Sequence, residues 1–105
     1  MIRGVVYRVD LGAGRHGHEQ RGRRYGLVLS PTDMAWSVAT IVPTSTRAQP
    51  AVFRPEIELA GVPTRFLADQ LRSIDVRFID GEPAFYLQRH ELEEVEVAVS
   101  RYLGL

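Results

Sequence analysis

Apolar and polar residues alternate at the start of the chain. Val5, Tyr7, Val9 and Leu11 occupy every second position, with Val6, Arg8 and Asp10 between them. A period of two is typical of a half-buried β-strand. Residues 12–24 are rich in glycine and arginine and show no periodicity, which predicts a long exposed loop.

Further short apolar or alternating segments are bounded by turn residues. Residues 25–29 suit a buried central strand, and residues 37–42 a third strand that Pro43 ends, because proline cannot donate to a ladder. Residues 53–59 alternate around Pro55, which favours an edge strand. The remaining predicted elements are one or two strands over residues 65–71 and 73–79, and turns at residues 30–33, 61–63 and 80–83.

The period changes near the C-terminus. Leu92, Val95, Val99 and Tyr102 recur at steps of three and four, and Ala98 joins this apolar stripe. Three glutamates stand in the first turns and Gly104 follows, as at a helix start and end. The sequence therefore predicts one domain over residues 1–105, a mainly β, antiparallel barrel with a C-terminal α-helix.

Composition narrows the possible functions. The 105 residues include no cysteine, which excludes disulfides, thiolate metal sites and thiol nucleophiles. No apolar run approaches the roughly 20 residues of a membrane span, and the pattern of a signal peptide is missing, so we expect a cytoplasmic protein without a membrane partner. All 13 cations are arginine, and residues 1–54 carry eight of them against three acids. A basic first half can attract a polyanion.

Two apparent motifs carry little weight. Residues 12–17 match the pattern G-x-G-x-x-G, but no apolar stripe follows to form the helix that a dinucleotide site needs. His16, His18 and Glu19 are metal-ligand types without a nearby third His or Cys, so we expect no metal and no cofactor. By contrast, the arginines at 21, 23 and 24 and the hydroxyls of Thr44, Ser45 and Thr46 suit phosphate chemistry, although such clusters also occur in ordinary loops and turns.

Four blocks of the chain resemble the MazF/PemK (Kid) family of toxins. They are residues 3–10, residues 17–30 with the string Gly-His-Glu-Gln-Arg-Gly-Arg-Arg, residues 41–46 with Ile-Val-Pro-Thr-Ser-Thr, and residues 68–75 with Ala-Asp-Gln-Leu-Arg-Ser-Ile-Asp. The tail at residues 87–105 is similar to the family's closing helix. The resemblance implies an SH3-like barrel, shared with CcdB, that forms a homodimer. It also implies metal-independent cleavage of single-stranded RNA, and inhibition by an acidic segment of a MazE-like antitoxin.

The resemblance also implies roles for particular residues. Arg24 falls on the catalytic arginine and Ser45 on the catalytic hydroxyl, with Thr44 or Thr46 as the alternatives if the register is shifted by one. Glu19 or Asp69 is the expected base, with His18 as an alternative. The positions matched to RNA contact are His18, Gln20, Arg21, Arg23, Thr44, Thr46, Asp69 and Gln70.

The chain departs from the family pattern at two positions. Tyr25 stands where the family has proline, and Val5 where it has an acid. Two other functions stay open at this point: a CcdB-like inhibitor of gyrase, and a catalytically inactive RNA-binding relative. Trp36 is a candidate for a dimer interface, or for packing beneath its own loop.

Overall fold

The computed structural model describes residues 1–13, 17, 19–34 and 37–105. Predictions for His16, His18 and Trp36 therefore lie outside the described residues. The elements in chain order are β1 (Val5–Asp10), β2 (Arg23–Val28), the 3-10 turn η1 (Thr32–Met34), β3 (Val38–Ser45), β4 (Glu56–Leu59), β5 (Val62–Phe66), η2 (Ala68–Gln70), β6 (Arg72–Asp75), η3 (Val76–Phe78), β7 (Ile79–Tyr86) and α1 (Arg89–Leu103).

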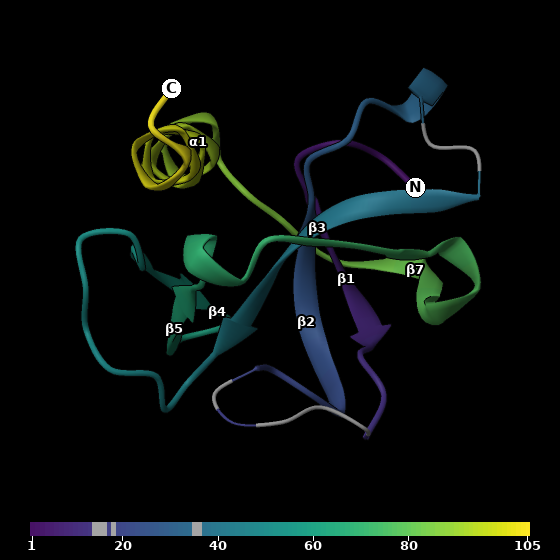
Figure 1. Ribbon diagram of the computed structural model, residues 1–105, viewed down its shortest axis with the longest axis horizontal. Coiled ribbons are helices and arrows are strands. Elements are labelled where there is room, and N and C mark those ends of the chain that lie inside the picture. Colours follow the sequence, from purple (N-terminus) through teal and green to yellow (C-terminus); the bar gives the residue numbers. More distant parts are fainter. Residues whose placement is uncertain (14–16, 18, 35–36) are drawn as a thin grey trace.

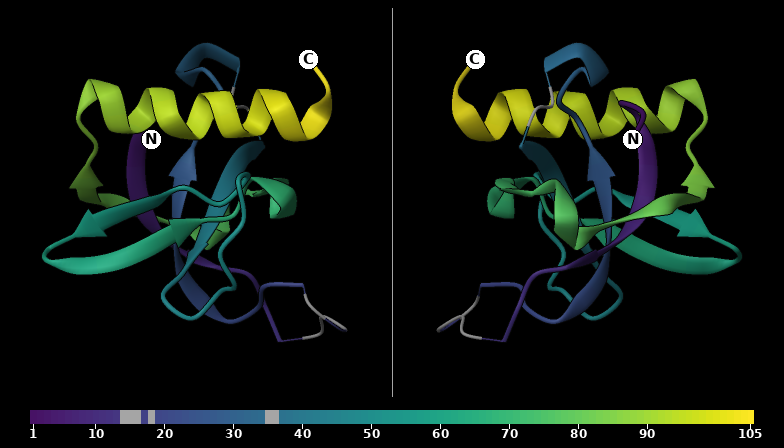
Figure 2. Two further views of the ribbon diagram at one scale, coloured as in Figure 1. Left: turned by 90° about the vertical axis from the view of Figure 1, so that its left-hand side faces the viewer. Right: turned by 90° about the vertical axis from the view of Figure 1, so that its right-hand side faces the viewer.

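The strands form one curled antiparallel sheet, a half-barrel, as the sequence predicts. Its order is β4-β5-β3-β2-β1-β7, and β6 pairs with β3. The helix lies across one end of the curled sheet, and residues 11–13 and 19–22, which follow β1 and precede β2, lie at the opposite end (Figures 1 and 2). The predicted edge position of the residue 53–59 segment is confirmed, although the strand itself begins only at Glu56, after Pro55.

Alternation along the strands divides the core into two clusters. Tyr7 and Val9 pack on one face with Ile41, whereas Val6 and Leu27 pack on the other. Val6 is fully buried, so the first half of β1 is covered on both faces and departs from the predicted half-buried pattern. From Tyr7 to Asp10 that pattern is confirmed, because Tyr7 and Val9 are buried whereas Arg8 and Asp10 are exposed.

The C-terminal helix begins and ends as predicted. Glu91 accepts a hydrogen bond from the backbone N–H of Gln88 at 2.8 Å, which forms half of a capping box. Val95 and Ala98 are buried against the sheet. Gly104 ends the helix with φ of 75°, a conformation that glycine adopts without steric cost. Tyr102 departs from the predicted core: it is half exposed, and its ring packs on Phe53 with centroids 5.3 Å apart. No helix among the described residues is long and apolar enough to cross a membrane.

Pro43 does not end the third strand, which runs on to Ser45. β3 pairs with β6 up to Ile41 and with β5 from Thr44 onward. Pro43 lies between these two partners, and its carbonyl accepts the N–H of Leu67 at 2.9 Å. The missing N–H therefore falls where the strand changes neighbours, and it interrupts neither ladder.

The predicted turn at residues 80–83 is wrong, because these residues belong to β7. The register of β7 against β1 shifts twice: Phe85 faces Val6, Pro83 faces Tyr7 and Ile79 faces Val9. Such bulges insert extra residues and hide the alternation that identifies a strand. The sequence pattern therefore missed the strand that flanks β1.

The predicted turn at residues 61–63 is displaced by one residue. Ala60 and Gly61 have φ of 51° and 81°, and Leu59 pairs with Val62 across them. Positive φ at both central residues is typical of a type I′ hairpin turn, which favours asparagine before glycine. Pro63 consequently lies within β5.

We expect Ala60→Asn to stabilise the protein. The left-handed conformation costs alanine about 1 kcal/mol, and asparagine tolerates it better. The free energy of unfolding in urea should rise by about 0.5–1 kcal/mol. Ala48→Asn, outside this turn, should bring no such gain, and an unchanged midpoint for Ala60→Asn would contradict the strain argument.

Candidate nucleic-acid-binding and active site

The predicted catalytic arginine lies on a strand, not in the loop where the sequence pattern placed it. Arg23 and Arg24 are the first residues of β2 and pair with Asp10 and Val9 of β1. Both arginine side chains are exposed. The strand fixes their backbone, which a long loop would not do.

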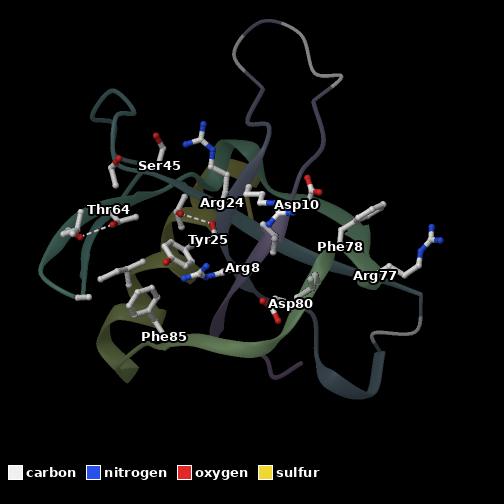
Figure 3. Close-up of a pocket in the computed structure, with 18 residues that line it drawn as sticks. Arg8, Asp10, Arg24, Tyr25, Ser45, Thr64, Arg77, Phe78, Asp80 and Phe85 are labelled. Carbon is white, nitrogen blue, oxygen red and sulfur yellow. Dashed lines mark hydrogen bonds between the residues drawn. The ribbon is translucent and has the colours of Figure 1, made fainter.

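The strand register brings Arg24 and Ser45 to the same face. Gly26 pairs with Pro43 at the last rung between β2 and β3. Extending this register by two residues sets Ser45 opposite Arg24, and opposite residues of antiparallel strands share a face. Figure 3 shows the two side chains at the same end of the groove.

One nitrogen of the Arg24 guanidinium forms a hydrogen bond within the protein. Its Nε donates to the carbonyl of Arg21 at 3.1 Å. No hydrogen bond to its two terminal nitrogens occurs among the described residues. Two adjacent terminal N–H groups form the fork that matches two phosphate oxygens.

The three hydroxyls after Pro43 differ in what they bind. The Thr44 hydroxyl donates to the carbonyl of Tyr25 at 2.8 Å, and the residue is buried. The Ser45 oxygen accepts the N–H of Arg47 at 3.1 Å, which leaves its own proton to donate. Thr46 is exposed at the groove.

These residues line one groove of about 780 Å³. Its charged residues are four arginines and two aspartates, and its aromatic residues come from three separate elements. The charged residues are Arg8, Arg23, Arg24, Arg77, Asp10 and Asp80, and the aromatic ones are Tyr25, Phe78 and Phe85. The groove is basic because its arginines outnumber its aspartates. Asp10 and Asp80 each accept a backbone N–H, at 2.9 and 3.2 Å.

Several groove residues were not predicted from the sequence. Arg8 could have been found, because it occupies an outward position in an alternating strand. Arg77 and Phe78 come from the unpredicted η3, and Phe85 from the unpredicted β7. Asp75 caps η3 by accepting the Arg77 N–H at 2.8 Å, and this hydrogen bond lowers the pKa of the Asp75 carboxyl.

Four of the predicted site residues lie elsewhere, in a second pocket of about 510 Å³. Glu19, Gln20, Asp69 and Gln70 line it and do not line the groove of Arg24. The Gln20 N–H donates to the Gln70 side-chain oxygen at 2.7 Å, which joins the β1–β2 loop to η2. The Gln20 side-chain oxygen is buried and has no hydrogen-bond partner among the residues that the structure describes.

The Asp69 carboxylate is engaged by an arginine. Arg54 donates to it from Nε at 3.0 Å and from a terminal nitrogen at 2.7 Å, and both side chains are mostly buried. Hydrogen bonding to Asp69 raises the pKa of the Arg54 guanidinium. Arg54 also donates to the carbonyl of Gln49, so the pair fastens the segment after β3 to η2.

No group of three or more His, Cys, Asp or Glu side chains suited to a metal ion occurs among the described residues. Arg21 contributes its carbonyl to Arg24 but does not line the groove. The structure thus brings together Arg23, Arg24, Thr44, Ser45 and Thr46, and it separates them from Glu19, Gln20, Asp69 and Gln70.

Comparison with known proteins agrees with this arrangement of strands. A putative toxin of Mycobacterium tuberculosis is 61% identical over 105 residues, which cover the whole of this chain and 99% of the relative. The crystal structure of MazF from Deinococcus radiodurans is 30% identical, with a TM-score of 0.86 over 100% of this chain and 97% of that one.

Two complexes also share the fold. The MazE–MazF complex from Deinococcus radiodurans has a TM-score of 0.79 and 26% identity, covering 100% and 96% of the two chains. An endoribonuclease from a mycobacterial species, in complex with its cognate antitoxin, has a TM-score of 0.80 over 100% and 96% of the chains; its 18% identity shows the fold alone. A family model described as a PemK-like, MazF-like toxin of type II toxin–antitoxin systems matches residues 2–103. The chain belongs to this toxin family.

Proposed function

We propose that this toxin is an endoribonuclease that cleaves single-stranded RNA at specific short sequences without a metal ion, and so inhibits translation. The observation that carries the proposal is the shared face of Arg24 and Ser45 at the end of a basic groove. A guanidinium fork beside a hydroxyl donor suits a phosphate on which charge grows.

The chemistry uses a nucleophile that RNA itself carries. The 2′-hydroxyl attacks the neighbouring phosphorus, the bond from phosphorus to the 5′-oxygen breaks, and the products carry a 2′,3′-cyclic phosphate and a 5′-hydroxyl. One proton leaves the 2′-oxygen for a base, and the 5′-oxygen takes up another. Arg24 stabilises the phosphate oxygens in the transition state, and the groove holds the strand in line.

Ser45 is the hydroxyl best suited to donate to the phosphate. Thr44 has already committed its proton to the Tyr25 carbonyl. Ser45 only accepts, from Arg47, and keeps its proton. Glu19, Asp69 and His18 remain the predicted candidates for the base. Arg54 occupies the Asp69 carboxylate, and both Glu19 and Asp69 line the second pocket and not the groove of Arg24.

The groove of Arg24 also indicates which partners the protein binds. We propose a cytoplasmic protein whose substrate is RNA and whose inhibitor is a MazE-like antitoxin, with an acidic extended segment that occupies the arginines of the groove. The MazE–MazF complex of Deinococcus radiodurans supports the antitoxin partner. We also propose a homodimer, for which apolar side chains such as Ile2 and Val38, each about half exposed, are available.

The decisive experiment incubates the purified protein with a long RNA in excess EDTA. We expect discrete fragments with 5′-hydroxyl ends, and DNA of the same sequence should remain intact because it lacks the 2′-hydroxyl. Intact RNA together with inhibition of gyrase supercoiling would favour the gyrase-directed function. Binding of RNA without fragments would identify an inactive relative.

The role of Ser45 predicts a pattern across four variants of the three hydroxyl residues. Ser45→Ala should lower the cleavage rate by about 10-fold to 100-fold, and Ser45→Thr should restore it, because only the alanine lacks the donor. Thr44→Ala should lower stability by about 1 kcal/mol through the lost bond to Tyr25. Single-turnover rates and urea unfolding measure both effects. An inactive but stable Thr44→Ala or Thr46→Ala protein would move the catalytic role to that residue.

A further inference from the structure

Tyr25 stands where the resembling family has proline, and its ring is built into the groove. The ring packs edge-on with Phe85, with centroids 5.1 Å apart and planes inclined by 79°. The Arg8 guanidinium lies 5.7 Å from the Tyr25 ring centre. The Thr44 hydroxyl holds the Tyr25 carbonyl at 2.8 Å, so the backbone that carries the ring is fixed as well.

The strand register explains why Arg8 and Tyr25 meet. They are directly opposite each other on β1 and β2, and therefore share a face. This face is the reverse of the one that Arg24 shares with Ser45, because successive side chains of a strand alternate. Arg24 and Tyr25 nevertheless line the same groove, so a ligand held at Arg24 has its next unit within reach of Tyr25.

An aromatic ring beside a guanidinium suits one nucleotide of a single strand. The base stacks on the ring while the cation meets a phosphate. Arg8 carries no ion pair among the described residues, so its charge is available to a ligand. The same groove also contains an arginine beside an aromatic ring at Arg77, 5.7 Å from the Phe78 ring centre, but Arg77 is already ion-paired with Asp75 at 3.1 Å. Figure 3 shows Arg77 and Phe78 apart from Tyr25.

We propose that Tyr25 is a base-stacking residue for the nucleotide next to the scissile phosphate, and that Arg8 holds the phosphate of that nucleotide. The proposal rests on the proposed RNA cleavage at Arg24. It assigns to Tyr25 the binding and positioning of substrate and no proton transfer. The phenol hydroxyl is dispensable for stacking, whereas the aromatic face is not.

The test compares Tyr25→Phe with Tyr25→Leu, because leucine fills much of the space beside Phe85 and lacks an aromatic face. The substrate is a short RNA that spans a cleavage site mapped with the unaltered protein. Its counterpart carries an abasic nucleotide on one side of the scissile phosphate, and a further counterpart carries it on the other side. We expect Tyr25→Phe to behave as the unaltered protein. Tyr25→Leu should raise KM for the complete RNA by about 5-fold to 100-fold, as the loss of one stacked base does.

The abasic substrates separate stacking from a structural effect. On one of them, the unaltered protein and Tyr25→Leu should cleave equally well, because the base that Tyr25 contacts is already missing. If Tyr25→Leu raised KM by the same factor on all three substrates, the proposal would be overturned. An unchanged KM on all three would overturn it as well. Tyr86→Ala is the control: Tyr86 is 70% exposed on β7 and lies outside the groove, so KM should not change.

A binding measurement keeps this proposal separate from the proposed cleavage. Fluorescence anisotropy with a 2′-deoxy version of the same oligonucleotide requires no chemistry. Weaker binding by Tyr25→Leu, and not by Tyr25→Phe, would support the stacking role even if the protein proved unable to cut RNA. Equal binding by all forms would overturn it. Thermal unfolding of each variant shows whether the comparison is made between folded proteins.

Discussion

We expect Arg24→Ala to abolish RNA cleavage while leaving the fold intact. The side chain is exposed at the start of β2 and, within the described part of the chain, makes one hydrogen bond, to the Arg21 carbonyl, so its loss removes little packing. Removal of one transition-state contact of this kind lowers the rate by about 100-fold or more. Single-turnover cleavage of a mapped RNA measures the effect, and circular dichroism confirms the fold.

Two further variants make the result specific. Arg24→Lys keeps the charge but not the two-pronged geometry, and we expect it to recover only part of the rate. Arg101→Ala removes an exposed arginine near the end of α1 and should cleave normally, since Arg101 lies outside the groove. A rate for Arg24→Ala within a few-fold of the unaltered protein would remove Arg24 from the mechanism.

The second large effect concerns stability. We expect Asp69→Ala to lower the free energy of unfolding by about 2–3 kcal/mol, because it leaves the Arg54 guanidinium mostly buried without its carboxylate. The segment that contains Arg54 would then lose its side-chain tie to η2 and keep backbone hydrogen bonds, such as the 3.2 Å bond from the Ala68 N–H to the Phe53 carbonyl. Urea unfolding measures the difference directly.

A matched control is available in an exposed ion pair. Arg3 and Glu96 meet at 2.7 Å with 39% and 37% of their side chains exposed, and Glu96→Ala should cost less than about 1 kcal/mol. Equal losses for the two alanine variants would refute the structural role of the buried pair. A stable Asp69→Ala protein that fails only in RNA cleavage would return Asp69 to the RNA-contacting role that its sequence motif predicts.

The sequence alone determined the elements whose pattern is uninterrupted. The stretch from Val5 to Leu11 keeps its period of two, and the helix keeps its apolar stripe at Val95 and Ala98, so both appear where expected. Glu91 and Gly104 mark the two helix ends because capping depends on residues close along the chain. Prediction from the residue pattern failed at residues 81–83, where β7 bulges against β1. It also failed at Pro43, which lies in β3 between the residues that pair with β6 and those that pair with β5.

The composition of the site was decided by tertiary structure. Arg24 and Ser45 are 21 positions apart, and only the register between β2 and β3 sets them on one face. The register between β1 and β2 sets Arg8 against Tyr25, and η3 and β7 add Arg77 and Phe85, which no short motif linked to the arginines of residues 21–24. Glu19 is near Arg24 in sequence, yet it lines the other pocket, because β2 begins after Gly22 and carries Arg24 away from the loop. Residues that are close in sequence are also close in space within a single turn or helix. Along a strand, each residue adds about 3.3 Å to the distance between them.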